Sequence, residues 1–160
     1  LNLPNRFILK MMLKNKEKIL NKENYICACG DFSELHKIRN FVYSKAQVFG
    51  FDDNDASKIA LAVDEACTNL IKHSFNLDKT KEFCVSVEPS SFNFTVKIHD
   101  KGQPFNPMEV DKLDMNEYFK NYKKGGLGIQ IIRAVMDEIR YVPSGEEGWE
   151  NELILTKIRN

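Results

Sequence analysis

The chain after residue 21 begins with a short apolar run and then shows a helical pattern of apolar positions. Tyr25–Cys29 is rich in strand-forming residues and predicts a β-strand. Asp31 or Ser33 then caps a helix that Gly50 ends, because these residue types are common at helix boundaries. The apolar positions of this helix recur every three or four residues and are Leu35, Ile38, Phe41, Val42 and Ala46.

A second helical pattern follows directly. It begins at Asp53 or Asp55 and runs to about His73. Its apolar face consists of Ile59, Ala62, Val63, Ala66, Leu70 and Ile71. The two patterns predict consecutive helices that each pack one side against a core.

The period then changes to two, which is typical of half-buried antiparallel strands. Two such strands are joined by a turn at Pro89-Ser90, and their apolar positions are Phe83, Val85, Val87, Phe92, Phe94, Val96 and Ile98. Two further strands, Glu138–Val142 and Glu152–Ile158, close the chain around a turn at Gly145 and Gly148.

An irregular stretch from Gly102 to Lys124 separates these pairs of strands, with a helical turn expected near Met115–Tyr122. The run Gly125–Gly128 then opens a helix whose inward positions are Ile129, Ile132, Ala134 and Val135. The order of elements predicts an α+β fold, a two-layer α/β sandwich with helices on one face of the sheet.

Length and charge limit the classes of protein. The 160 residues suit one domain, which we expect over residues 22–160 after an N-terminal extension of residues 1–21. The extension is apolar and basic but lacks the continuous apolar core of a signal peptide. The 23 basic and 23 acidic residues cancel, so the chain carries no overall field for nucleic acid or an anionic membrane. No apolar run is long enough to span a membrane.

Four cysteines are too few for a disulfide scaffold in a chain of this length. Cys27 and Cys29 lie two apart in a strand, Cys67 and Cys84 are isolated, and no paired C-x-x-C knuckles indicate zinc. We therefore expect reduced, structural thiols in a cytoplasmic protein.

One group of polar residues lies on the second helix. Glu65, Asn69, Lys72 and His73 follow the spacing i, i+4, i+7 and i+8, so a regular helix would place them on one face. A solvated helix face would show the same pattern. The asparagine is a poor helix former, however, and oxygen donors such as Glu65 and Asn69 suit Mg²⁺ rather than zinc.

A second group lies at the end of a strand and before the last helix. Counting by two from Phe92 puts the Asp100 carboxylate on the core side, where it needs a donor partner; an aspartate in a glycine turn is the simpler alternative. The glycines before Ile129 can expose helix N–H groups to a phosphate, or they can form a flexible linker.

The order and spacing of these groups resemble the GHKL ATPases. Glu65-Ala-Cys-Thr-Asn69-Leu-Ile-Lys-His73 resembles their N box, and Asp100-Lys-Gly102-Gln-Pro104-Phe105-Asn-Pro107 resembles the D-x-G box of anti-sigma-factor serine/threonine kinases. Gly125–Ile129 and the following helix are similar to the second glycine box of that group. The resemblance covers about residues 25–157 and implies a mixed sheet covered on one face by helices.

The resemblance implies a role for each matching residue. Asn69 would coordinate the Mg²⁺ that bridges the ATP phosphates, and Glu65 would be the general base. Asp100 would receive the adenine amino group, with help from Thr156 through water. The remaining positions would border the base or the phosphates and are Lys72, Gly102, Gly126, Leu127 and Gly128.

The resemblance also implies the function. An anti-sigma kinase would hold a sigma factor, or an equivalent regulator, and phosphorylate a serine of a small antagonist protein, commonly as a homodimer. The alternative is a non-catalytic nucleotide-binding module that sequesters a partner; Glu65 favours the kinase because a pure binder needs no base. A histidine-kinase fragment with His36 as phosphoacceptor is disfavoured, since too little helix precedes Asp53.

Three lysines occupy the segment between the two boxes. Lys120, Lys123 and Lys124 either belong to a solvated loop or reach the phosphates when this lid closes. His73 is expected to be structural or to support the site indirectly.

Overall fold

The computed structural model describes residues 22–110, 126–144 and 150–160. The expected extension of residues 1–21, the turn near residues 115–122, the lid lysines and the turn at Gly145 and Gly148 lie outside these ranges.

Five strands form one sheet in the order β1-β2-β3-β5-β4. Their bounds are Tyr25–Cys29 (β1), Glu82–Pro89 (β2), Asn93–Asp100 (β3), Glu138–Val142 (β4) and Asn151–Ile158 (β5). The strands match the predicted ones closely, and β5 begins one residue earlier than expected. The expectation of a mixed sheet is wrong in one respect, because every described pairing is antiparallel. Two helices separate β1 from β2, as predicted, and β2 runs antiparallel to β1.

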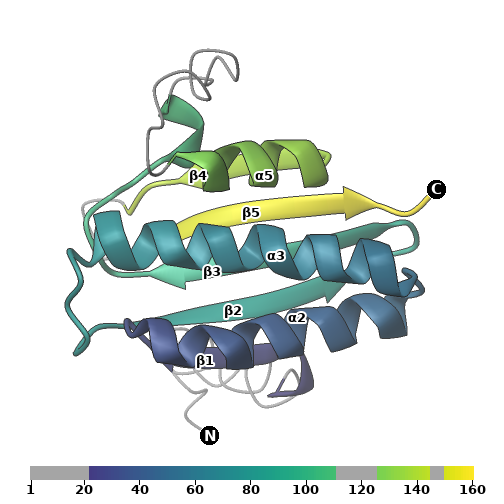
Figure 1. Cartoon of the computed structure of the whole chain (residues 1–160), viewed down its shortest axis with the longest axis horizontal. Helices are drawn as coiled ribbons and strands as arrows, with labels where there is room; N and C mark the ends of the chain where they lie inside the picture. The colour runs from purple at the N-terminus through teal and green to yellow at the C-terminus, as the bar shows by residue number, and fades with distance from the viewer. Residues whose placement is uncertain (1–21, 111–125, 145–149) are drawn as a thin grey trace, which may run out of the picture.

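Among the described residues, three helices lie on one face of this sheet and confirm the two-layer α+β fold. Figure 1 shows this arrangement of helices over the strands. The helices are α2 (Leu35–Phe49), α3 (Asp53–Asn69) and α5 (Leu127–Val135), and a π-helical turn, η3 (Leu70–Ser74), extends α3. Gly50 ends α2 in the left-handed conformation, with φ of 113°. Asp52 caps α3, since its carboxylate accepts a hydrogen bond of 2.8 Å from the Asp55 N–H.

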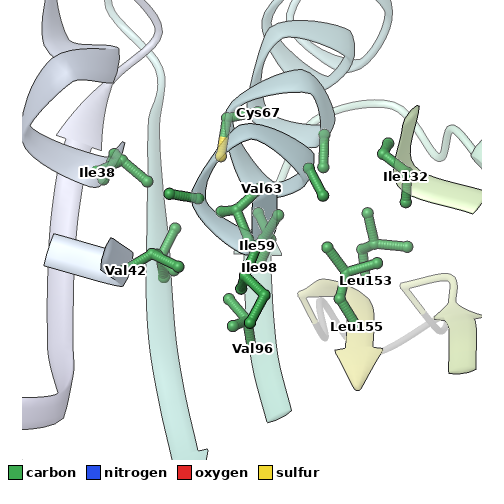
Figure 2. Packing of buried hydrophobic residues seen from close by; sticks show 14 of the residues in the cluster. Ile38, Val42, Ile59, Val63, Cys67, Val96, Ile98, Ile132, Leu153 and Leu155 are labelled. Atoms are coloured by element: carbon green, nitrogen blue, oxygen red, sulfur yellow. The ribbon is translucent and has the colours of Figure 1, made fainter. Parts of the chain in front are cut away.

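The core lies between the helices and the sheet. Figure 2 shows Val63 of α3 above Val96 and Ile98 of β3, all of them 0–1% exposed. The inward positions predicted from the two periods are confirmed with two exceptions: Phe92 precedes β3 and is 65% exposed, and Ala134 on α5 is exposed. This core fixes α3 and the end of β3, the two elements that carry the candidate site.

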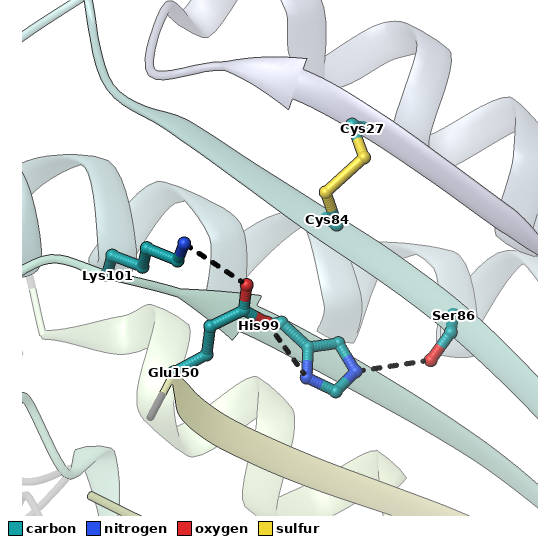
Figure 3. Close-up of a disulfide and its surroundings, with 6 residues drawn as sticks. All are labelled: Cys27, Cys84, Ser86, His99, Lys101 and Glu150. Carbon is teal, nitrogen blue, oxygen red and sulfur yellow. Dashed lines mark hydrogen bonds and ion pairs between the residues drawn. A yellow bond between two sulfur atoms is a disulfide. The ribbon is translucent and has the colours of Figure 1, made fainter. Parts of the chain in front are cut away.

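The opposite face of the sheet carries a disulfide bond between Cys27 and Cys84 (Figure 3). The expectation of four reduced thiols is therefore wrong for these two residues. They lie directly opposite each other in the β1–β2 register, with Cα atoms 4.0 Å apart, and a strand pattern does not reveal such a pairing. Cys29 is free and exposed, whereas Cys67 is free and buried, and burial raises the pKa of the Cys67 thiol.

Candidate functional site

Asp100 is the buried acid at the end of β3. The strand alternates so that Phe94, Val96, Ile98 and Asp100 face the helices, which confirms the inward placement of the carboxylate. Three donors converge on its Oδ1: Ser74 Oγ at 3.2 Å, the Gly102 N–H at 2.8 Å and Asn151 Nδ2 at 3.1 Å. No described residue donates to Oδ2. One oxygen is thus held by the protein, and the other is left to accept a hydrogen bond from a ligand.

Asn151 is a site residue that the sequence reasoning missed. It is fully buried at the start of β5, opposite Asp100, and its amide also donates to the Gly102 carbonyl at 2.9 Å. Its Oδ1 accepts a hydrogen bond from the Ser144 N–H at 2.8 Å. The polar residue before the apolar run of β5 was the available signal, but only the antiparallel register with β3 reveals its partner.

Thr156, by contrast, does not lie beside Asp100. It pairs with Thr95 in the sheet, and the two hydroxyl oxygens are 3.1 Å apart. Thr156 lies five positions from Asn151, or about 17 Å along the strand, and this odd separation puts its side chain on the other face of the sheet. The expectation that Thr156 helps Asp100 is therefore wrong, and Asn151 occupies that position.

Asn69 and Asp100 line the same pocket, which confirms that the fold brings these two predicted residues together. The pocket is lined by Ala66, Asn69, Leu70, Ser74, Ile98, Asp100, Phe105, Pro107, Tyr141 and Leu153. The Asn69 Nδ2 atom is buried and has no hydrogen-bond partner among the described residues. An unpaired buried donor is costly, so the Asn69 amide is suited to a polar ligand in this pocket.

Glu65 meets the start of α5. Its carboxylate lies against Gly128, where any added Cβ would overlap Glu65 Oε2. Gly126 caps α5 in the left-handed conformation, with φ of 87°, and Gly126 and Leu127 are exposed. The structure therefore brings together the predicted base and the predicted glycine run, beside helix N–H groups that can receive an anion.

The π-turn at the end of α3 changes the predicted polar face. The Phe75 N–H donates to the Leu70 carbonyl at 3.0 Å, so Lys72 and His73 do not continue the regular α-helical spacing from Glu65. Lys72 is exposed. His73 stacks on Phe105, with ring centroids 4.6 Å apart and ring planes 23° apart. The four polar residues, Glu65, Asn69, Lys72 and His73, therefore lie near the same end of α3, but they do not form one row along the helix.

Gly102 is required by a close approach of two backbones. A Cβ at this position would lie 2.6 Å from the Ser74 carbonyl oxygen and 2.8 Å from Phe75 Cδ1. The Ser74 hydroxyl also contacts the Gln103 carbonyl, and the Gln103 N–H donates to the Ser74 carbonyl at 3.0 Å. The D-x-G segment is thus docked on the end of the N-box helix, which holds Asp100 beside Asn69.

Two further contacts hold the segment after Gly102. The Phe105 N–H donates to the Tyr141 hydroxyl oxygen at 3.0 Å, and burial is the main cause that raises the pKa of Tyr141. The Arg133 guanidinium donates to the Val110 carbonyl at 2.7 Å. The described part of the lid is therefore tied to β4 and α5 on the same side as the pocket.

The sequence of this chain is similar to those of known proteins. Residues 31–157 match the model of the histidine kinase-like ATPase domain. Serine-protein kinase RsbW of Bacillus licheniformis is 29% identical over 100 residues, which cover 59% of this chain and 62% of that protein. The RsbW kinase of Bacillus mycoides is 27% identical over 133 residues, 81% of this chain and 79% of that protein. The match thus spans less than two thirds of the Bacillus licheniformis relative.

The fold has a solved counterpart. The crystal structure of the SiaB-SiaC complex from Pseudomonas aeruginosa contains a chain that superposes with a TM-score of 0.60 at 14% identity. The alignment covers 91% of this chain and 96% of that one, which shows a shared fold. In the described ranges no helix is both long and apolar enough to cross a membrane. Because the family model spans most of its length, the chain belongs to the histidine kinase-like ATPase domain family.

Proposed function

We propose that this chain binds ATP with Mg²⁺ in the Asp100–Asn69 pocket and transfers the γ-phosphoryl group to a serine of a protein substrate. The observation that carries the proposal is the pairing of a half-satisfied buried carboxylate with an unpartnered buried amide in one pocket. The resemblance to enzymes named serine-protein kinases supports the choice of a protein serine as acceptor.

The adenine end of the nucleotide would bind at Asp100. The free Oδ2 is an acceptor, which suits the exocyclic amine of adenine and not the carbonyl oxygen that guanine carries at the same position. Asn151 and Ser74 hold the other oxygen, so the acceptor is positioned before the ligand arrives. Selectivity for adenine over guanine follows from this arrangement.

The phosphates would lie between Asn69 and the start of α5. The amide oxygen of Asn69 is a hard donor of the kind Mg²⁺ prefers, and Mg²⁺ sites with nucleotides commonly use few protein ligands. When bound, the metal ion neutralises charge on the phosphates. The N–H groups at Gly126, Leu127 and Gly128 would add positive potential at the start of α5. The exposed ammonium group of Lys72 would contact the phosphates.

Glu65 would act as the general base. The acceptor serine oxygen forms a bond to the γ-phosphorus, the bond to the leaving ADP oxygen breaks, and the serine proton passes to the Glu65 carboxylate. The Glu65 carboxylate lies against Gly128, which would be the phosphate end of the site, where a base for the attacking hydroxyl is needed.

We also propose a cellular role for this reaction. Residues 22–160 would form the ATPase domain of a cytoplasmic partner-switching kinase. This kinase would bind a sigma factor or equivalent regulator, phosphorylate a small antagonist protein and act as a homodimer. The relatives that are named serine-protein kinases support the kinase activity and its serine substrate.

A matched pair of variants tests the reaction. Glu65→Gln should bind Mg-ATP within about threefold of wild type but lose at least about 100-fold in phosphoryl transfer to the antagonist encoded nearest to this protein. Asp100→Asn should lose ATP binding itself. If wild type and Glu65→Gln bind Mg-ATP equally and neither transfers a phosphoryl group, the chain is a nucleotide-binding module without kinase activity. If both transfer it at the same rate, Glu65 is not the base.

A further inference from the structure

The open face of the sheet carries a row of four residues that the ATPase site does not use. In the strand register Cys27 pairs with Cys84, Cys84 with His99 and His99 with Glu152. The His99 ring lies 3.4 Å from Ser86 Oγ through Nε2 and 3.5 Å from Glu152 through Nδ1 (Figure 3 shows the disulfide and the ring). A disulfide and a hydrogen-bonded imidazole therefore occupy neighbouring positions on exposed sheet.

The disulfide ties down an edge strand. β1 has five residues and pairs only with β2, so its other edge has no strand neighbour in the described sheet. Short edge strands open more easily than central ones, because fewer backbone hydrogen bonds hold them. The Cys27–Cys84 bond is the covalent restraint against that opening.

The two sulfur atoms of the bond differ in accessibility. Cys27 is exposed and Cys84 is half-buried beside His99, so a nucleophile reaches Cys27 first and Cys84 is the leaving thiolate. Cys29, two residues from Cys27, is exposed and free and provides a matched comparison on the same strand.

We propose that the Cys27–Cys84 bond is a reversible thiol–disulfide exchange site, opened by a dithiol reductant, and that its opening weakens the adenine end of the nucleotide site. One thiolate of the dithiol attacks the Cys27 sulfur, the Cys27–Cys84 bond breaks, and Cys84 leaves as a thiolate. The second thiol then attacks the mixed disulfide and releases Cys27. The dithiol loses two electrons and becomes a disulfide, while its two protons end on Cys27 and Cys84.

A single ring connects β1 to the nucleotide site. Phe75, which is 1% exposed, is wedged between two glycines: a Cβ on Gly30 would lie 2.7 Å from its Cδ2, and a Cβ on Gly102 would lie 2.8 Å from its Cδ1. Gly30 directly follows β1 and Gly102 is the glycine of the D-x-G box. If β1 loosens, Gly30 no longer packs against one side of the Phe75 ring. The other side of this ring supports Gly102.

A second set of contacts links the disulfide to the nucleotide site through β2. Phe83 pairs with Asp100 in the sheet and packs against Phe75, with ring centroids 6.3 Å apart, and Cys84 is the next residue. This second half of the proposal rests on the proposed function, because it takes Asp100 and Gly102 as the adenine end of an ATP site. A coupling between sites needs only a difference of a few-fold in affinity between two states of β1.

The experiment compares the full chain in oxidised and reduced dithiothreitol buffers. Amide hydrogen exchange of peptides covering β1, Phe75 and Gly102 is measured, and Mg-ATP is titrated by calorimetry in each buffer. Cys27→Ser and Cys84→Ser remove the bond, and Cys29→Ser is the control that keeps it. The redox midpoint is read from the mass shift after alkylation of free thiols.

The proposal predicts faster exchange of β1 amides and about fivefold or more weaker ATP binding in the reduced protein. Cys27→Ser and Cys84→Ser should match the reduced state in both buffers, whereas Cys29→Ser should respond to the buffer as wild type does. Equal ATP affinity in both redox states, or unchanged exchange of β1, would overturn the proposal.

A failure of the proposed function gives a different result. If the protein binds no ATP in either buffer, the ATP site itself is wrong, and hydrogen exchange at Phe75 and Gly102 becomes the readout of coupling. Faster exchange there on reduction still supports the redox connection, and unchanged exchange overturns it.

Discussion

Asn151 offers the sharpest test of how the adenine end is built. Replacement by alanine removes two amide donors, to Asp100 Oδ1 at 3.1 Å and to the Gly102 carbonyl at 2.9 Å, together with the acceptor for the Ser144 N–H at 2.8 Å. Each such bond contributes about 1 kcal/mol net, so Asn151→Ala should lower the free energy of unfolding by about 3 kcal/mol. For a domain of this size that is about 10 °C in Tm.

The effect on ligand binding follows from the same contacts. Without Asn151, Asp100 keeps two of its three donors, and the buried carboxylate is free to rotate away from the position that suits a ligand. We expect ATP affinity to fall about tenfold, which corresponds to about 1.4 kcal/mol, the free-energy scale of one well-placed hydrogen bond. Thermal melts and calorimetric titration of the same samples separate the two effects.

Thr156→Val is the matched control. Thr156 is buried and bonded to Thr95, so its loss should cost about 1 kcal/mol of stability. Because Thr156 lies on the other face of the sheet, ATP affinity should stay within twofold of wild type. A result in which Thr156→Val weakens ATP binding as much as Asn151→Ala does would refute the assignment of Asn151 to the site.

Three other changes have defined outcomes. Gly128→Ala places a methyl group onto the Glu65 carboxylate, which must move away, so phosphoryl transfer should fall at least about tenfold in a kinase assay; unchanged activity would contradict the contact. Gly102→Ala forces a Cβ to 2.6 Å from the Ser74 carbonyl, so urea unfolding should show a loss of about 2 kcal/mol, whereas a loss below about 0.5 kcal/mol would contradict the close approach. Burial raises the pKa of Asp64, and Arg39 at 3.2 Å opposes this only in part, so wild type should lose stability as pH rises from about 4 through the raised pKa. The Tm of Asp64→Asn minus that of wild type should therefore grow between pH 4 and pH 7, and a constant difference would be inconsistent with the raised pKa.

Local patterns were sufficient to predict the elements of this fold. The bounds of β1 and β4 and the inward placement of Asp100 follow from apolar and polar positions along single segments. The position of Gly126 and Gly128 at the start of a helix is likewise predicted from the residue types that are common there. These features depend on neighbours within a few residues, and a sequence records such neighbours directly.

These local patterns do not predict contacts between segments that are distant in the sequence. The register of β5 against β3 puts Asn151 beside Asp100 and Thr156 far from it, and nothing within β5 distinguishes the two polar residues. The Cys27–Cys84 bond depends in the same way on the β1–β2 register. The π-turn after Asn69 arises where the chain leaves the helix to dock on Gly102, so the regular spacing assumed for Lys72 and His73 did not hold.

The central claim is that the Asp100–Asn69 pocket is an adenine-nucleotide site. Calorimetric titration of the wild-type chain with Mg-ATP and with Mg-GTP tests this site, because adenine carries an amine at C6 that can donate to the free Asp100 oxygen, whereas guanine carries a carbonyl oxygen there that cannot. We expect ATP to bind at least about tenfold more tightly than GTP, and Asp100→Asn to lose this preference. Equal affinity for ATP and GTP, or no binding of either nucleotide, would contradict it.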